Sequence, residues 1–340
     1  MQAVILVGGE GTRLRPLTYT VPKPALPLAN RPFVSYMVNW LAGHGVDDVV
    51  MACGFLADKL RVVLGDDIDG IRIRYVTEPE PRGTGGAVKF VQELLDQRFF
   101  VLNGDVLTDF DLSAVRRVHE QRNAKATLSL IPVDDPTAYG LVRTVADGEI
   151  EAFLEKPQPE QIDTDQINAG AYVIEREVIE QMADDRTVSF ERETFPALIG
   201  NGLYGVRVEG YWLDIGTAAR YLQATRDILN GTVETSVEPT ADAGLVAPSL
   251  VGANCEIAAG ATVGPLACLG AGCKVGAGAT VERSALHDGV DVAAKAVVRD
   301  SIVGAEATIG VSAIVENETI VAARTTVDAR KRLSGGRVER

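Results

Sequence analysis

The sequence predicts an α/β domain with a mostly parallel sheet, followed by a parallel β-helix. Over residues 1–229, short apolar runs alternate with longer segments of helical periodicity. This alternation is typical of a parallel sheet with helices on both faces. After residue 243, an aliphatic residue recurs every six positions, which is the pattern of a parallel β-helix. Residues 230–243, rich in Thr, Glu, Pro and Ala and without apolar periodicity, are predicted to be a linker.

The elements of the first domain follow from the spacing of its apolar residues. Runs rich in apolar residues predict strands at Ala3–Val7, Asp48–Cys53, Ile71–Thr77, Phe99–Asn103 and Ala126–Pro132. Helical patterns predict helices at Phe33–His44, Ala87–Leu95, Leu112–Arg122 and, closing the domain, Tyr221–Leu229. Because ligands of such sheets bind at the carboxyl ends of the strands, functional residues are expected directly after these runs.

The second domain carries a hexad repeat whose aliphatic residue points inward on each side of a coil. The repeat slips by one residue after Val281 and again after Val298, and its members are Val251, Ile257, Val263, Leu269, Val275, Val281, Leu286, Val292, Val298, Val303, Ile309, Val315, Val321 and Val327. Cys255 and Cys273 lie three hexads apart, so we expect them to stack on adjacent coils as small buried side chains and not as a disulfide. The β-helix is predicted over residues 244–328, and the basic tail 329–340 is expected to be a solvated end.

A glycine-rich loop follows the first strand. Glycines let the backbone approach a polyphosphate and direct its N–H groups at it, and the loop comprises Gly8, Gly9, Gly11 and Thr12. Positive charge beside it comes from Arg13, Arg15 and Lys23. Neither the P-loop nor the dinucleotide-binding fingerprint matches this spacing. The motif predicts a phosphate-binding loop, and a plain strand-to-helix turn is the alternative.

This loop, together with Pro22-Lys23-Pro24, resembles the signature of the sugar-1-phosphate nucleotidyltransferases, and the resemblance covers almost the whole chain. It implies a Rossmann-like nucleotidyltransferase domain followed by a left-handed β-helix. It also implies that a nucleoside triphosphate binds the glycine loop, and that Arg13 and Lys23 hold its phosphates.

Two carboxylates follow apolar strands, Asp105 after the run ending at Asn103 and Asp214 after Tyr211-Trp212-Leu213. Taken alone, each is also explained as a turn or helix-cap residue. Mg²⁺ prefers one or two carboxylates together with phosphate oxygens. The resemblance assigns this pair to the metal, so Asp105 and Asp214 are the expected Mg²⁺ ligands.

The resemblance assigns further residues to the two substrates. In the block Glu80–Ala87, the expected nucleotide-binding residues are Glu80, Gly83 and Gly86. The expected sugar-phosphate residues are Gly140, Glu155, Lys156 and Asn168. Without the resemblance, the adjacent Glu155 and Lys156 are equally well explained as an exposed ion pair.

Two blocks are similar to the guanylyl-transferring branch of the family, which makes GDP-mannose from GTP and mannose 1-phosphate. Ser189–Pro196 matches the pattern Ser-x-Glu-x-(Glu/Asp)-x-Phe-Pro, and a capping box starting at Ser189 fits poorly because Arg192 occupies its third position. The block Glu80–Ala87 departs from the branch, because Arg82 replaces Leu and Gly85 replaces Ala. UTP or dTTP with glucose 1-phosphate, GTP with another sugar 1-phosphate, and a non-catalytic regulatory subunit remain alternatives.

The expected mechanism is one in-line displacement, in which a sugar-phosphate oxygen attacks the α-phosphorus and pyrophosphate leaves. Because this nucleophile is already an anion, no general base is needed, and Arg13, Lys23 and Lys156 act by alignment and charge neutralisation. A second activity, acyl transfer on the β-helix, would usually require a histidine as general base. His287 is the candidate for that role in the repeat.

Composition excludes other classes. The 340 residues suffice for two domains, and a net charge of −14 argues against a nucleic-acid partner. No apolar run has the length of a membrane span and no leader precedes the first strand, so we expect a cytoplasmic protein without a membrane partner. The cysteines lack CxxC spacing, which argues against zinc. The flat sides and open end of a β-helix favour a homo-oligomer, a dimer or higher.

Overall fold

The computed structural model describes residues 1–54, 56–184, 186–242 and 244–339. The ends of the predicted linker and tail, residues 243 and 340, lie outside them. The chain forms two compact units. The first, here called the sheet unit, comprises Met1–Gly9 and Val34–Trp212. The second, here called the coil unit, comprises Glu10–Phe33 and Leu213–Arg340, so the segment after the glycine loop belongs with the β-helix.

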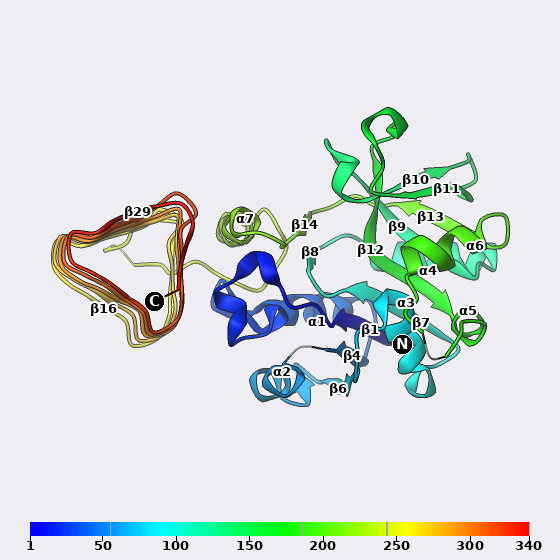
Figure 1. Cartoon of the computed structure of the whole chain (residues 1–340), viewed down its shortest axis with the longest axis horizontal. Helices are drawn as coiled ribbons and strands as arrows, with labels where there is room; N and C mark the ends of the chain where they lie inside the picture. Colours follow the sequence, from blue (N-terminus) through cyan, green and yellow to red (C-terminus); the bar gives the residue numbers. More distant parts are fainter. Residues whose placement is uncertain (55, 185, 243, 340) are drawn as a thin grey trace. The chain divides into compact units, whose positions relative to one another are not determined.

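The sheet unit is built on a mixed sheet whose centre is parallel (Figure 1). Its strands, in spatial order, are β11 (Ile150–Glu155), β10 (Gly140–Thr144), β12 (Gln166–Glu175), β7 (Arg98–Asn103), β1 (Gln2–Val7), β4 (Asp48–Cys53), β6 (Ile71–Thr77) and β5 (Asp67–Ile68). β9 (Ala126–Pro132) pairs with β12, and β13 (Leu203–Arg207) pairs with β9. β1 pairs in parallel with β4 and β7, which confirms the parallel core. Antiparallel β12, β10 and β11 extend it, so the sheet is less uniformly parallel than expected.

The helices are α1 (Phe33–Gly43), α2 (Ala57–Leu64), α3 (Gly83–Phe90), α4 (Leu112–Arg122), α5 (Arg176–Glu180), α6 (Phe195–Leu198) and α7 (Ala218–Leu229). The predicted helix Ala87–Leu95 was misplaced: α3 begins four residues earlier, and only a short 3-10 turn, Gln92–Leu94, follows it. The core of the sheet unit explains the shift. Ala87 and Val88 are buried in the same core as Val4 and Val101, and the helix that carries them begins in the glycine stretch before them.

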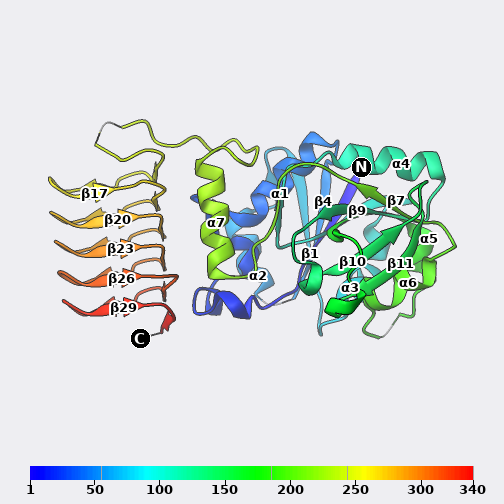
Figure 2. The same ribbon diagram turned by 90° about the horizontal axis from the view of Figure 1, so that it is seen from above.

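The β-helix of the coil unit has a triangular cross-section, and its coils stack along one axis (Figures 1 and 2). Within residues 244–339, each side is a parallel sheet. The first side contains β15 (Leu250–Val251), β18 (Cys268–Leu269), β21 (Ala285–Leu286), β24 (Ile302–Val303), β27 (Ile320–Val321) and β30 (Arg337–Val338). The second contains β16 (Glu256–Ile257), β19 (Lys274–Val275), β22 (Asp291–Val292), β25 (Thr308–Ile309) and β28 (Thr326–Val327). The third contains β17 (Thr262–Val263), β20 (Thr280–Glu282), β23 (Val297–Arg299), β26 (Ile314–Glu316) and β29 (Arg332–Ser334).

The predicted hexads account for these strands. Most of the repeat's aliphatic residues are buried in one core, for example Val292, Ile309 and Val315 at 0% exposure. Cys273 is buried in the same core, Cys255 packs against it, and all four cysteines of the chain are free thiols. β29 and β30 lie in the segment expected to be a solvated tail. Its inward-facing Leu333 and Val338 continue the repeat, while its charged residues face outward.

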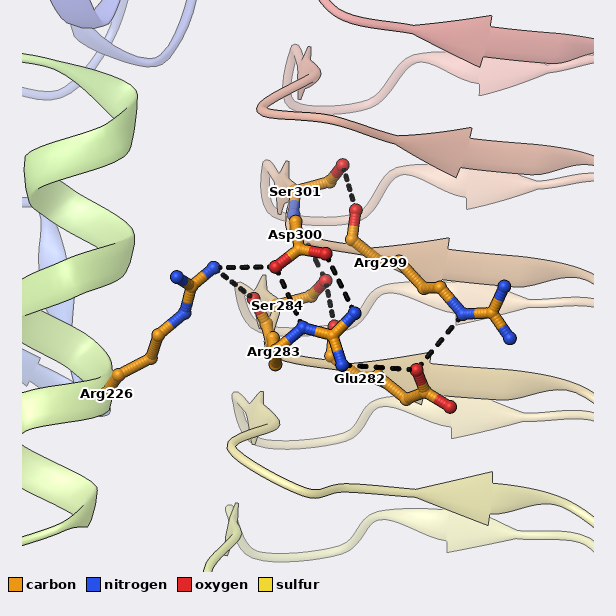
Figure 3. Close-up of polar contacts among 7 residues, drawn as sticks. All are labelled: Arg226, Glu282, Arg283, Ser284, Arg299, Asp300 and Ser301. Carbon is orange, nitrogen blue, oxygen red and sulfur yellow. Dashed lines mark hydrogen bonds and ion pairs between the residues drawn. The ribbon is translucent and has the colours of Figure 1, made fainter.

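The two slips of the repeat produce a stacked ion pair. They fall at Arg283 and Asp300, corner residues with φ of 47° and 45°. The Arg283 guanidinium binds Asp300 through Nε–Oδ1 and Nη2–Oδ2 hydrogen bonds, both of 2.9 Å. Arg226 of α7 reaches the same carboxylate at 2.8 Å (Figure 3). α7 is thereby anchored to the coils, alongside which it lies (Figure 2).

The coil unit also contains the segment between the glycine loop and α1. This segment forms short 3-10 turns at Thr12–Leu14, Leu17–Tyr19 and Lys23–Ala25, and then a small hairpin of β2 (Pro27–Leu28) and β3 (Arg31–Pro32). In the described parts of the chain, no helix is both long enough and apolar enough to cross a membrane.

Candidate functional site

The first glycines of the loop lie at the carboxyl end of β1 in the sheet unit. A Cβ added to Gly54, after β4, would lie 2.8 Å from the carbonyl oxygen of Gly8, so these two strand ends approach closely. Around Gly9 there is open space within 4 Å of such a Cβ. Gly8 also faces Glu78, which the sequence analysis did not single out. Burial raises the pKa of Glu78, and its carboxylate accepts a hydrogen bond from the Arg82 amide at 3.0 Å.

The predicted nucleobase block is held against the segment before Ser189. The amides of Gly85 and Gly86 donate to the Val188 carbonyl at 2.9 and 3.1 Å. Gly83 has a φ of +74°, and a Cβ there would lie 2.6 Å from the same carbonyl. Packing on Val188 therefore requires glycine at this position, whatever ligand the loop binds. Glu80 is exposed beside it.

Glu191 joins this block to the segment that follows. Its Oε2 accepts hydrogen bonds from the hydroxyls of Thr84 and Ser189, each at 2.7 Å. The Thr84 hydroxyl in turn accepts from the Phe190 amide at 2.9 Å. The sequence matched this block to a family pattern without giving Glu191 a role. The position of Glu191 directly after Ser189-Phe190 in that pattern was the feature that could have drawn attention to it.

Ser189 is a helix cap, contrary to the expectation that a cap fits poorly here. Its hydroxyl accepts from the Arg192 amide at 3.2 Å, and Glu193 accepts from the Ser189 amide at 3.2 Å. The reciprocal carboxylate comes one residue later than in a capping box, because the helical turn Phe190–Thr194 is a wider π turn.

Asp105 follows a close contact between neighbouring strands. The Gly104 amide donates to the Leu6 carbonyl at 3.0 Å, and a Cβ on Gly104 would lie 2.5 Å from that oxygen. A larger residue cannot fit, so the turn brings the half-buried Asp105 beside the end of β1. In the sheet unit this is the strand end that carries Gly8.

The predicted sugar-phosphate residues come together in the sheet unit. Gly140 pairs with Glu155 across the antiparallel strands β10 and β11. The Lys156 amide donates to the Tyr139 carbonyl at 2.9 Å, and its backbone is left-handed with φ of 53°. Asn168 lies on β12, which pairs with β10, and its amide donates to the buried Tyr172 hydroxyl at 2.8 Å.

Glu155 is electrostatically strained. Burial raises its pKa above the ordinary value of 4.5, and the nearby Glu191 carboxylate raises it further. Lys156 and Arg192 oppose this shift. A half-buried carboxylate facing a second one suits hydroxyl groups, which donate hydrogen bonds to both.

Because the pKa of Glu155 is higher in the folded protein than in the unfolded chain, the folded state binds this proton more tightly. At a pH above this raised pKa, ionised Glu155 therefore lowers the free energy of unfolding. This loss of stability disappears as the pH falls to 4.5. Glu155→Gln is expected to raise the melting temperature at neutral pH and to converge with the wild type near pH 4.5. Thermal unfolding across this range measures it. If the melting temperatures of the wild type and the variant differed by the same amount at every pH, the raised pKa of Glu155 would be contradicted.

The coil unit holds the predicted cations. Gly11 is left-handed with φ of +62°, and a Cβ there would lie 3.1 Å from the Lys23 side chain. A Cβ on Gly216 would lie 2.5 Å from Nη2 of Arg13, so the Arg13 guanidinium lies over the backbone two residues after Asp214. Within the coil unit, Lys23 thus lies beside Gly11, and Arg13 lies beside the turn that follows Asp214. Thr12 is exposed at the start of its 3-10 turn.

Other reactive groups are unsuited to covalent or base catalysis. Burial raises the pKa of Cys53, Cys268 and Cys273 to about 12. Burial lowers the pKa of His287 to about 4, and its ring is enclosed, which argues against acyl transfer on the coils. Among the described residues, no cluster of three or more His, Cys, Asp or Glu side chains could hold a metal ion.

Comparison with known proteins agrees with this arrangement. Residues 2–231 match the family model for nucleotidyl transferases, and residues 245–338 match the model for the GMPPB C-terminal domain. The mannose-1-phosphate guanylyltransferase of Mycobacterium tuberculosis is 42% identical over 68% of this chain, which spans 65% of that protein. Probable mannose-1-phosphate guanylyltransferase 2 of Arabidopsis thaliana is 34% identical over 94% of this chain and 91% of its own length.

A solved structure is also similar. HddC from Yersinia pseudotuberculosis, in a crystal structure complexed with GMP-PN, is 27% identical with a TM-score of 0.56. The match covers 66% of this chain and 97% of HddC.

Proposed function

The chain belongs to the nucleotidyl transferase family, and we propose that it transfers a guanylyl group from GTP to mannose 1-phosphate, giving GDP-mannose and pyrophosphate. The observation that carries this proposal is the similarity of nearly the whole chain, coils included, to mannose-1-phosphate guanylyltransferases. Its local support is the block Gly83–Gly86, fixed against Val188 and joined through Thr84 to Glu191.

The triphosphate is held by the glycine loop and by the cations beside it. Gly8, Gly9, Gly11 and Thr12 direct backbone N–H groups at the phosphates, as the open space around Gly9 and the left-handed backbone of Gly11 permit. Arg13 and Lys23 neutralise the charge that develops on the leaving pyrophosphate. Glu80, Gly83 and Gly86 face the guanine base.

The sugar 1-phosphate is held by the residues that β10, β11 and β12 bring together. Lys156 aligns the phosphate. Glu155 accepts hydrogen bonds from sugar hydroxyls, Asn168 accepts them or donates them, and Gly140 contacts the sugar through its backbone. The phosphate oxygen attacks the α-phosphorus directly. No base is required because the nucleophile is already an anion. The buried thiols and the buried His287 ring are not needed for this step.

A divalent cation, Mg²⁺, fits the donor set of Asp105 and Asp214. Two carboxylates suit a hard cation that takes its remaining ligands from phosphate and water. When bound, such a cation supplies charge neutralisation at the phosphates. We further propose that the chain works in the cytoplasm as a homo-oligomer, a dimer or higher.

Pyrophosphate release with Mg²⁺ tests the choice of substrates. GTP, UTP, dTTP, CTP and ATP are each combined with mannose 1-phosphate and with glucose 1-phosphate. GTP with mannose 1-phosphate is expected to have the highest kcat/KM. A preference for UTP or dTTP with glucose 1-phosphate would overturn the base assignment, and no release from any pair would favour a regulatory subunit.

A further inference from the structure

The hairpin after Lys23 is held by residues of the β-helix and α7. Lys23 opens the 3-10 turn that leads into β2, and the hairpin reverses at Ala29 and Asn30, with φ of 43° and 61°. Sequence position would attach this hairpin to the nucleotidyltransferase domain. In the structure it packs within the coil unit instead, so its partners are the coils.

The tip of the hairpin is clamped to the first side of the β-helix. Nδ2 of Asn30 donates to the Leu269 carbonyl at 2.7 Å, and its Oδ1 accepts a hydrogen bond from the Cys268 thiol at 3.2 Å. Cys268 is 3% exposed, and burial raises its pKa to about 12. The thiol therefore stays protonated and keeps its donor role at any physiological pH.

The base of the hairpin is held through Tyr221 of α7. The Tyr221 hydroxyl donates to the Pro27 carbonyl, and Nε2 of His287 lies 3.1 Å from the same hydroxyl oxygen. Because the hydroxyl proton is committed to Pro27, His287 must donate its Nε2–H to Tyr221. The three groups form a directed chain of hydrogen bonds from the coil to the backbone of the hairpin. Tyr221 and His287 are 2% and 7% exposed, so water cannot readily replace either bond.

This chain lies next to the predicted phosphate-binding lysine. Tyr221 and Lys23 line the same small cavity, together with Leu14 and Ile215. The last coil reaches the other cation, because Nη2 of Arg337 donates to the Arg13 carbonyl at 2.9 Å. The two cations assigned to the triphosphate, Lys23 and Arg13, thus lie next to Tyr221, which His287 of the coils holds, and Arg337 of the last coil. The residues from Arg13 to Lys23 are here called the phosphate-binding segment.

We propose that the β-helix positions the phosphate-binding segment, with Asn30, Tyr221 and His287 as positioning residues for Lys23, and Arg337 for Arg13. The coils then contribute to triphosphate binding, in addition to any part in assembly. The inference rests on the proposed function in one respect, that Lys23 and Arg13 bind the triphosphate, and it is independent of which base or sugar is used.

Two variants of the full-length protein test it. Tyr221→Phe keeps the ring and removes both hydrogen bonds of the hydroxyl. Asn30→Gly tolerates the left-handed backbone and removes the amide clamp. Each is expected to lower kcat/KM for the nucleotide at least about tenfold, with KM for the sugar 1-phosphate unchanged within about twofold, because only the triphosphate site is displaced. A calorimetric Kd for GTP, measured without sugar phosphate, should weaken in parallel.

Ile309→Ala is the matched control, since it opens a cavity in the core of the coils without removing any of these hydrogen bonds. It is expected to lower the melting temperature and to keep wild-type kinetics at a temperature where every variant is folded. Wild-type nucleotide affinity and kcat/KM in Tyr221→Phe and Asn30→Gly would overturn the inference, and Asn30→Gly decides alone if Tyr221→Phe does not fold. A wild-type protein that binds no nucleoside triphosphate would instead overturn the proposed function.

Discussion

Lys23→Ala is expected to lower kcat about 10²–10³-fold while the protein stays folded, because in the proposed mechanism it removes a charge that stabilises the leaving pyrophosphate. Lys23→Met separates charge from packing. The aliphatic part of Lys23 lies against Gly11 and lines the small cavity, and methionine keeps most of that volume. Both variants should therefore lose activity to a similar extent, whereas the methionine variant should retain the wild-type melting temperature. Steady-state kinetics and thermal unfolding measure the two effects.

The control for Lys23 is Lys59→Met, which removes the same charge from an exposed position on α2. It is expected to leave kcat and KM unchanged, and so to exclude an effect of net charge alone. Near wild-type kcat in Lys23→Met would show that the ammonium group takes no part in the reaction. The role assigned to Lys23 would then be wrong.

Asp105→Asn is expected to lower kcat at least about 10²-fold, since losing a metal ligand forfeits several kcal/mol of charge stabilisation. The amide has nearly the shape of the carboxylate, and the close approach to Leu6 of β1 is made by the neighbouring Gly104, so the fold should persist. The Mg²⁺ concentration that gives half-maximal rate should rise as well. Titration of the rate with Mg²⁺, alongside circular dichroism, provides the measurement.

Asp111→Asn is the companion control for this substitution. Asp111 caps α4 by accepting from the Ala114 amide at 3.1 Å, and asparagine caps helices equally well. Its Mg²⁺ dependence should match the wild type. If Asp105→Asn also kept the wild-type rate and Mg²⁺ dependence, Asp105 could not be a metal ligand.

Strands were predictable where burial on both faces leaves an uninterrupted apolar run. β4 and β9 have the expected boundaries for that reason, whereas β6 has them although the exposed Arg72 lies between its buried Ile71 and Ile73. The hexads predicted the coils because each inward position must be aliphatic. Local patterns failed where a distant segment decides the structure. Gly83–Gly86 lay outside the predicted helix Ala87–Leu95, because glycine disfavours helix, yet packing against Val188 requires glycine there.

The candidate site was predictable to the extent that motifs are contiguous. Asp105, Glu155 and Lys156 stand at strand ends that a parallel sheet or a paired hairpin makes visible. The contacts that hold such residues in place could not be predicted from the sequence. Asn30 and its partner Leu269 are 239 residues apart, and Glu191 reaches Thr84 across 107 residues. No periodicity encodes these pairings, because they depend on the completed fold.

A competition assay tests the proposed reaction most directly. The protein, with Mg²⁺, receives equal concentrations of GTP, UTP and dTTP together with equal mannose 1-phosphate and glucose 1-phosphate, and the nucleotide sugars formed are identified by mass spectrometry. GDP-mannose is predicted to be the main product, in amounts matching the pyrophosphate released. A product mixture dominated by UDP-glucose or dTDP-glucose would contradict the account.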